Sequence, residues 1–203
     1  MFFEIEGIDG TGKTTQCWLL KEYFYSLGLD SLIIKELDST EFSREVKKIL
    51  TSNSAKDARA EMFLFLSCKC QVFSQLIRPS LESGLHIISD RGLGSFMSYN
   101  SSILNLELSK LRDLLEFCSL DYKPDLTFLL DIPGEAARER IFQKNEQTRF
   151  DLVSMDILTR QREKFLEIAA LSPSWLVIDG LKSIKSIQNI IRKQVEKRLP
   201  SKV

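Results

Sequence analysis

The sequence predicts an α/β fold in which five parallel strands form a sheet with helices on both faces. Short runs of apolar residues, typical of buried strands, recur along the chain, and the longer segments between them place apolar residues at helical spacing. Strands that are apolar on both faces and alternate with helices favour a parallel sheet. A glycine-rich segment between the first strand and the first helix supports the same prediction.

The expected elements follow from these patterns in chain order. The strands are expected at Phe2–Glu6, Ser31–Lys35, Leu85–Ser89, Leu126–Asp131 and Trp175–Ile178. Helical spacing is clearest in two apolar series, Leu108, Leu111, Leu114, Leu115 and Cys118, and Leu158, Phe165, Leu166 and Ala169. In a parallel sheet of this kind, the ligand crevice lies at the carboxyl ends of the strands.

Length and composition are typical of one domain without a strong electrostatic field. The chain has 203 residues, 43% of them hydrophobic, and we expect a single domain over residues 1–203. Its 28 basic and 28 acidic side chains cancel. This balance argues against a nucleic acid polymer or an anionic membrane as partner and favours small molecules.

The cysteines predict reduced thiols rather than a metal site. They lie in apolar, helix-like segments, and the closest pair lacks the two-residue gap that is typical of zinc sites. No apolar run has the length of a membrane span, and the first residues enter a strand without the charged region of a signal peptide. We therefore expect a soluble, cytoplasmic protein. The cysteines are Cys17, Cys68, Cys70 and Cys118.

The glycine-rich segment has the spacing G-x-x-x-x-G-K-[ST] of a phosphate-binding loop. Its glycines allow successive backbone N–H groups to point at phosphate oxygens, and the following helix adds its dipole. Lys13 then reaches the β- and γ-phosphates of a nucleoside triphosphate. A turn that merely packs a helix on a strand would need neither Lys13 nor Thr14. The predicted ATP-binding residues are Gly7, Ile8, Asp9, Gly10, Thr11, Gly12, Lys13, Thr14 and Thr15.

A magnesium site and a catalytic arginine are expected beside this loop. Thr14 supplies a hydroxyl group to Mg²⁺, and Asp90, at the end of an apolar strand, can approach the same ion. Arg91 can hold phosphate oxygens with its planar guanidinium. A simple ion pair between Asp90 and Arg91 is the weaker interpretation, because adjacent residues that leave a strand point apart.

A second group of basic residues surrounds a polar stretch that follows the fourth strand. We expect a small lid over about residues 143–150, with Arg140 and Arg149 as catalytic cations. Arg138 and Lys144 fit a solvated helix face at least as well. Together with the strand pattern, these motifs predict the three-layer P-loop NTPase fold with a small lid.

Over nearly its whole length, the chain resembles the thymidylate kinase family, the nucleoside-monophosphate kinases that act on dTMP. Agreement at several positions in the same order is more specific than any one motif. The matching segments are Glu6–Gly10 leading into the phosphate loop, Glu36, Glu61–Phe65, Asp90–Arg91, Tyr99 and Arg149–Asp151.

The resemblance implies roles for acceptor-binding residues. Asp9 is expected to contact the 3′-hydroxyl group of the acceptor, Phe65 to stack on its base, and Tyr99 to exclude a 2′-hydroxyl group. Taken alone, both rings fit ordinary core positions at least as well. Gly10 stands where some members carry an arginine, so the catalytic cations are expected from the lid. The expected acceptor-binding residues are Asp9, Lys35, Glu36, Lys47, Phe65, Lys69, Arg91, Ser95, Tyr99 and Asn100.

The chain departs from the family pattern on the acceptor side. Asn100 is one methylene shorter than the usual glutamine, Gly92 replaces an aromatic residue, and the loop at residues 35–40 lacks the family's proline and two glycines. Lysine stands where the family has arginine at Lys35, Lys47 and Lys69. Lysine keeps the charge but loses the planar, bidentate geometry of arginine. The base preference therefore stays open.

We expect a kinase that transfers the γ-phosphoryl group of Mg-ATP to dTMP. No general base is needed, because the acceptor phosphate is already anionic. Two alternatives remain, a related kinase with another deoxynucleotide or a nucleoside as acceptor, and a weakly active nucleotide-binding paralogue. A GTP-dependent switch is disfavoured, because the sequence has no Asn-Lys-x-Asp segment. The resemblance also implies a homodimer through helices, with which the apolar segment Met62–Val72 is compatible.

Overall fold

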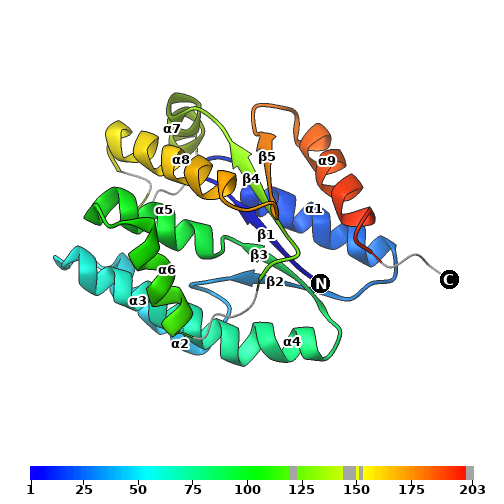
Figure 1. The fold of residues 1–203 in the computed structure, drawn as a ribbon, viewed down its shortest axis with the longest axis horizontal. Coiled ribbons are helices and arrows are strands. Elements are labelled where there is room, and N and C mark those ends of the chain that lie inside the picture. The colour runs from blue at the N-terminus through cyan, green and yellow to red at the C-terminus, as the bar shows by residue number, and fades with distance from the viewer. Residues whose placement is uncertain (119–122, 144–149, 151–152, 200–203) are drawn as a thin grey trace.

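The computed structural model describes residues 1–118, 123–143, 150 and 153–199. Its five strands form an all-parallel sheet in the order β2-β3-β1-β4-β5, with helices on both faces (Figure 1). The expected fold is confirmed. The strands are β1 (Phe2–Glu6), β2 (Ser31–Lys35), β3 (His86–Asp90), β4 (Leu126–Asp131) and β5 (Trp175–Asp179).

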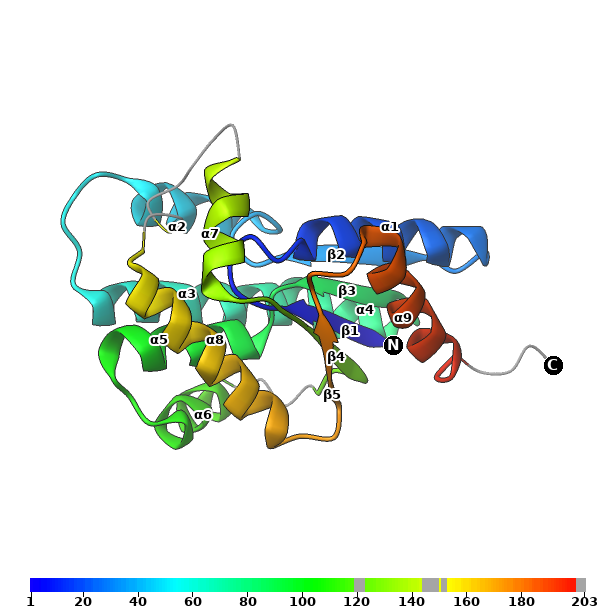
Figure 2. The same ribbon diagram turned by 90° about the horizontal axis from the view of Figure 1, so that it is seen from above.

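The helices form two layers that cover opposite faces of the sheet (Figure 2). Helices α1 and α9 pack on one face, and α3, α4, α5 and α8 lie on the other. The helices are α1 (Lys13–Ser26), α2 (Glu41–Thr51), α3 (Ala58–Val72), the π-helical turn η1 (Phe73–Ile77), α4 (Arg78–Glu82), α5 (Leu93–Leu104), α6 (Leu108–Phe117), α7 (Gly134–Phe142), α8 (Met155–Ala170) and α9 (Ile184–Glu196).

Strand β1 lies in the centre of the sheet and is buried on both faces. Because side chains alternate along a strand, Phe3 and Ile5 pack with α1 and α9, whereas Phe2 faces α3 and α5. The same alternation places two carboxylates, Glu4 and Glu6, on the α5 face, where both are buried. An apolar strand therefore carries a polar pair beneath the start of α5.

Two strands differ from the expected bounds by one residue. The expected strand Leu85–Ser89 lies at His86–Asp90, because the Leu85 amide donates to the Ser80 carbonyl at the end of α4. Ladder pairing starts with the His86 amide, which donates to the Asp30 carbonyl at 3.1 Å. Strand β5 extends beyond Ile178 to Asp179, which pairs with the last residue of β4.

The loop between β2 and α2 closes through side chains rather than glycines. The Lys35 amide donates to Ser39 Oγ at 2.7 Å, and the Ser39 amide donates back to the Lys35 carbonyl. Thr40 then caps α2 by accepting from the Ser43 amide at 3.0 Å. These bonds hold Lys35 and Glu36 at the end of β2.

No helix in the described part of the chain is long and apolar enough to cross a membrane. All four cysteines carry free thiols, and those of Cys17 and Cys68 are buried.

Candidate active site

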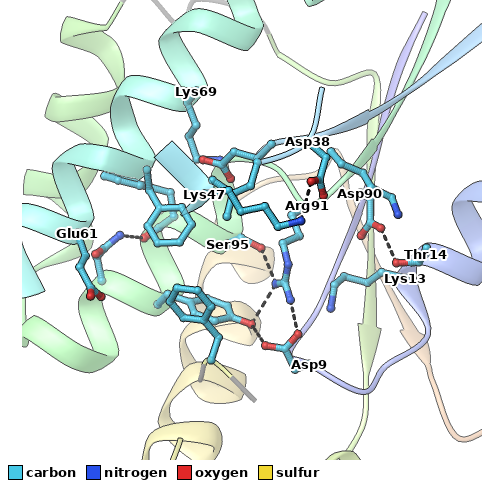
Figure 3. Close-up of a pocket in the computed structure, with 18 of the residues that line it drawn as sticks. Asp9, Lys13, Thr14, Asp38, Lys47, Glu61, Lys69, Asp90, Arg91 and Ser95 are labelled. Atoms are coloured by element: carbon cyan, nitrogen blue, oxygen red, sulfur yellow. Dashed lines mark hydrogen bonds and ion pairs between the residues drawn. The ribbon is translucent and has the colours of Figure 1, made fainter. Parts of the chain in front are cut away.

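A cavity of about 660 Å³ lies at the carboxyl ends of β1, β2 and β3, within the usual size range of small-molecule sites. Lys13, Thr14 and Asp90 lie on one side of it and Glu61 lies on the other, with Arg91 and Asp9 between them (Figure 3). The cavity therefore has a phosphate-loop end and a second end built from α3 and α5.

Most of the residues expected in the site line this cavity. They are Asp9, Gly10, Gly12, Lys13, Thr14, Thr15, Lys35, Glu36, Lys47, Phe65, Lys69, Asp90, Arg91, Ser95, Tyr99, Asn100 and Arg140. Gly7, Ile8 and Thr11 do not line it and are buried within the phosphate loop. Their contribution is to the shape of the loop.

The phosphate loop holds the side chain of Lys13 against its own backbone. Helix α1 begins at Lys13, directly after Gly12 in a left-handed conformation. Lys13 Nζ donates to the Ile8 carbonyl at 2.8 Å, and Thr11 Oγ1 donates to the same oxygen at 3.0 Å. Burial, reinforced by the charge of Arg91, lowers the pKa of Lys13 to about 8. An anion in the loop would favour the charged form of this ammonium group.

Thr14 and Asp90 bring two oxygen atoms together at the edge of the loop. Thr14 Oγ1 donates to Asp90 Oδ2 at 2.5 Å, although the two residues come from α1 and β3. Oxygen donors are the ligands that Mg²⁺ prefers. The pair is therefore chemically suited to that ion.

Arg91 joins the two ends of the cavity. Its guanidinium donates to Asp9 Oδ1 at 2.5 Å, to the Tyr99 hydroxyl at 3.0 Å and to Ser95 Oγ at 3.3 Å. Tyr99 also donates to Asp9 Oδ2 at 2.9 Å. Burial opposes the charge of Arg91, but the neighbouring Asp9, Tyr99, Asp90 and Glu6 together outweigh burial and raise the pKa of Arg91 further above its usual value. Asp90 and Arg91 thus point to different partners, as expected for neighbours leaving a strand.

The second end of the cavity is largely apolar. Phe65 lines it from α3, and its ring meets Phe150 edge-on with centroids 5.8 Å apart. Phe96 and Asn100 line it from α5, and the Asn100 amide nitrogen donates to the Phe96 carbonyl at 2.7 Å. Tyr99 stays protonated, because burial raises its pKa. An aromatic wall with a few polar atoms suits a planar base.

The three lysines of the acceptor side have different surroundings. Lys47 Nζ binds Asp38 Oδ1 at 2.6 Å, and both side chains are exposed to solvent. Lys69 Nζ binds Glu36 Oε2 at 2.9 Å in a buried pair. Burial raises the pKa of Glu36 although the charge of Lys69 opposes this. Lys35 lines the cavity and is half-buried.

The basic residues after β4 do not all reach the cavity. Arg140, on α7, donates to the Gly180 carbonyl at 3.2 Å and to the Gly10 carbonyl at 3.5 Å, so it contacts the phosphate loop. Arg138 binds the Val153 carbonyl instead and does not line the cavity. Residues 144–149 of the expected lid, which include Lys144 and Arg149, lie outside the described residues.

Two buried side chains that hold the backbone beside Arg91 were not expected as site residues from the sequence, namely Glu6 and Ser89. Glu6 accepts hydrogen bonds from the Gly92 and Ser95 amides, both at 2.8 Å, and from Ser95 Oγ at 2.6 Å. Ser89 Oγ donates to the Arg91 carbonyl at 2.5 Å. A carboxylate inside an apolar strand was the signal that could have revealed Glu6, because a buried charge needs partners.

The chain is similar to known proteins over nearly its whole length. A family model described as thymidylate kinase matches residues 5–191. A thymidylate kinase of Thermosipho africanus is 34% identical over 202 residues, which cover 99% of this chain and 100% of the relative. A probable thymidylate kinase of Thermococcus kodakarensis is 31% identical over 97% of both chains, and a thymidylate kinase of Neisseria gonorrhoeae is 31% identical over 96% of both. The chain therefore belongs to the thymidylate kinase family.

Proposed function

We propose that this protein transfers the γ-phosphoryl group of ATP to the 5′-phosphate of dTMP, giving dTDP and ADP. The observation that carries the proposal is the Arg91 network, which binds Asp9 of the phosphate loop and Tyr99 of the aromatic end within one cavity. Two phosphorylated substrates can therefore meet at Arg91. Family membership over nearly the whole chain supports dTMP as the acceptor.

In this reaction an oxygen of the acceptor phosphate forms a bond to the γ-phosphorus of ATP. The bond between that phosphorus and the β,γ-bridging oxygen breaks, and its electron pair leaves with ADP. The acceptor oxygen is already anionic, so no side chain has to remove a proton. Catalysis then depends on positioning and on cations that match the charge on the transferring group.

The donor phosphates are proposed to bind the phosphate loop, with Lys13 at the β- and γ-phosphates. Thr14 and Asp90 would hold Mg²⁺, because their oxygens already lie 2.5 Å apart. In the described residues no three His, Cys, Asp or Glu side chains cluster, which suits an ion that keeps water and phosphate ligands. When bound, Mg²⁺ would offset negative charge on the phosphates.

The catalytic cations are proposed to be Lys13, Arg91, Arg140 and Arg149. Arg140 already contacts the phosphate loop at the Gly10 carbonyl. A Cβ atom at Gly10 would lie 2.6 Å from the Ala137 carbonyl oxygen, so the loop has no room for a side chain there. Arg149 is proposed from the basic cluster in the sequence and from the family resemblance, because it lies outside the described residues. A cation supplied from α7 therefore replaces one supplied by the loop.

The acceptor is proposed to bind between α3 and α5. Phe65 would stack on the base, and Tyr99 and Asp9 would face the sugar, where their mutual hydrogen bond at 2.9 Å already fixes both. Arg91 would hold the phosphate. The other residues proposed to contribute to acceptor binding are Lys35, Glu36, Lys47, Lys69, Ser95 and Asn100.

We also propose one domain over residues 1–203, a cytoplasmic location and a homodimer. The buried free thiols suit a reducing compartment. Met62, Leu66 and Val72 are used in the protein's own core, whereas Phe63 on α3 and Phe42 and Ile49 on α2 are exposed and available to a second copy. Light scattering would check the assembly, with a monomer at micromolar concentration as the contrary result.

Replacing Lys13 tests the donor half of the proposal. Lys13→Ala should abolish ADP formation with dTMP, because it removes the buried ammonium group of the phosphate loop that is proposed to contact the β- and γ-phosphates. Lys48→Ala, at an exposed lysine of α2, is the matched control and should keep wild-type rates. A coupled assay for ADP measures both variants. Undiminished turnover by Lys13→Ala would refute the mechanism.

A further inference from the structure

The backbone turn at Arg91 and Gly92 has an unusual conformation. Arg91 has a φ of +77°, in the left-handed region that residues with a side chain disfavour. The turn directs the guanidinium of Arg91 toward Asp9 and Tyr99. Some other part of the structure must therefore hold this turn.

All four backbone polar groups of the turn are hydrogen-bonded. The Arg91 amide donates to the Ile5 carbonyl at 3.1 Å. The Arg91 carbonyl accepts from Ser89 Oγ at 2.5 Å, and the Gly92 amide donates to Glu6 Oε1 at 2.8 Å. The Gly92 carbonyl accepts from Lys69 Nζ at 2.8 Å. Three of the four partners are thus buried side chains, so the turn depends on side chains rather than on secondary structure alone.

Lys69 has little freedom to act elsewhere. Its side chain is 7% exposed, and its ammonium group uses two of its three N–H donors for Glu36 Oε2 and the Gly92 carbonyl. Both acceptors are part of the protein. A role in reading the base would rest on the third donor, because Lys69 also lines the cavity.

Given the proposed function, we propose that Lys69 is a positioning residue of Arg91 rather than a reader of the base. It holds the Gly92 carbonyl, and with Ser89 and Glu6 it keeps Arg91 in its left-handed conformation. Glu36 in turn fixes the ammonium group of Lys69. Lys69 therefore affects the acceptor phosphate only by positioning Arg91. This effect should be the same whichever base the acceptor carries.

The two roles predict different kinetics for Lys69→Met, which removes the donors but keeps an unbranched side chain. A displaced Arg91 should lower kcat, by up to ~10²-fold, for every acceptor. The probes are dTMP and 4-thio-dTMP, whose sulfur at position 4 is a weak hydrogen-bond acceptor. The ratio of their kcat/KM values should be the same in the variant and the wild type. A ratio that collapses toward one would show that Lys69 donates to the base carbonyl, and would overturn the inference.

Ser89→Ala is the matched variant, because Ser89 holds the same turn but does not line the acceptor cavity. Ser89→Ala should lower kcat for both acceptors and leave the ratio of their kcat/KM values unchanged. Its effect on kcat should be less than additive with that of Lys69→Met. Wild-type kcat in Ser89→Ala, or strictly additive effects, would contradict a shared role. Because Lys69→Met leaves Glu36 buried without its partner, Lys69→Met with Glu36→Gln serves as the variant in which no buried charge is left unpaired.

A crystal structure of the Lys69→Met and Glu36→Gln double variant gives a readout that does not depend on turnover. We expect the Gly92 carbonyl to rotate and the Arg91 guanidinium to leave Asp9. An unchanged left-handed Arg91 that still binds Asp9 and Tyr99 would overturn the inference. Absence of dTMP turnover by the wild-type enzyme would instead refute the proposed function, and the structural comparison would still decide the role of Lys69.

Discussion

Glu4 is a carboxyl group in the middle of an apolar strand. Its side chain is buried on the α5 face of β1, where it accepts a hydrogen bond from Thr127 Oγ1 at 3.2 Å. Burial, reinforced by the charge of Glu6, raises the pKa of Glu4 to about 8. Glu4 is therefore mostly protonated in the folded protein at neutral pH.

This raised pKa predicts a stability that falls as the pH rises. The bound proton stabilises the fold fully below the ordinary pKa of 4.5, and the contribution is lost as the pH rises toward about 8. For one proton the slope is at most about 1.4 kcal/mol per pH unit. Glu4→Gln stays neutral, so its free energy of unfolding should increase relative to the wild type over the same pH range.

Urea unfolding at a series of pH values measures this difference. Glu45→Gln, at an exposed carboxylate of α2, is the control and should follow the wild-type profile. Parallel profiles for Glu4→Gln and the wild type would contradict the buried, protonated state of Glu4.

Single residues could be predicted from the sequence where a local motif determines them. Lys13 and Thr14 follow from the spacing of the phosphate loop, and Arg91 follows from its place after a strand. The buried side chains that hold the backbone after Arg91 could not be predicted in this way. Glu6 and Ser95 are 89 residues apart in the chain, and their contact exists only because β1 and β3 are neighbours in the sheet.

At the scale of the elements, the phosphate loop and α7 approach each other closely at Gly10. Gly10 has a φ of +83°, and an added Cβ atom would lie 2.6 Å from the Ala137 carbonyl oxygen. Gly84 has the same φ, but nothing lies within 4 Å of its added Cβ atom. Substitutions at these two glycines therefore distinguish the free-energy cost of the left-handed backbone from the cost of the steric contact with α7.

Alanine at these two positions should destabilise the protein by different amounts. Gly84→Ala should cost about 1–2 kcal/mol, the penalty of a left-handed backbone with a side chain. Gly10→Ala should cost a further ~1–3 kcal/mol, because the loop or α7 must move, and it should also weaken ATP binding. Thermal unfolding and ATP titration measure the two effects. Equal destabilisation by both substitutions would contradict a close contact between the loop and α7.

Strands and helices could largely be predicted from apolar spacing, but their ends could not. The start of β3 depends on whether the Leu85 amide pairs with β2 or closes α4, and only the fold decides this. The loop after β2 lacks the two glycines of the family pattern, yet Ser39 and Thr40 close it through side-chain bonds. The spacing of apolar residues does not show whether a backbone group will be hydrogen-bonded by another backbone group or by a side chain.

At the scale of the whole molecule, the strand order β2-β3-β1-β4-β5 makes the site. The order places the ends of β2 and β3 beside the phosphate loop that follows β1, so Lys35, Asp90 and Lys13 line one cavity. The parallel sheet and this shared edge were predictable from the alternation of strands and helices. The acceptor end was not, because it depends on how α3 and α5 pack on the sheet.

The most direct test of the account is a comparison of acceptors with Mg-ATP as donor. Initial rates of ADP formation should be measured with dTMP, dUMP, dCMP and thymidine, and without an acceptor. We predict the highest kcat/KM for dTMP, with a kcat of about 1–100 per second, and little hydrolysis of ATP without an acceptor. A higher kcat/KM for thymidine or for another monophosphate, or no transfer to any of the four, would contradict the account.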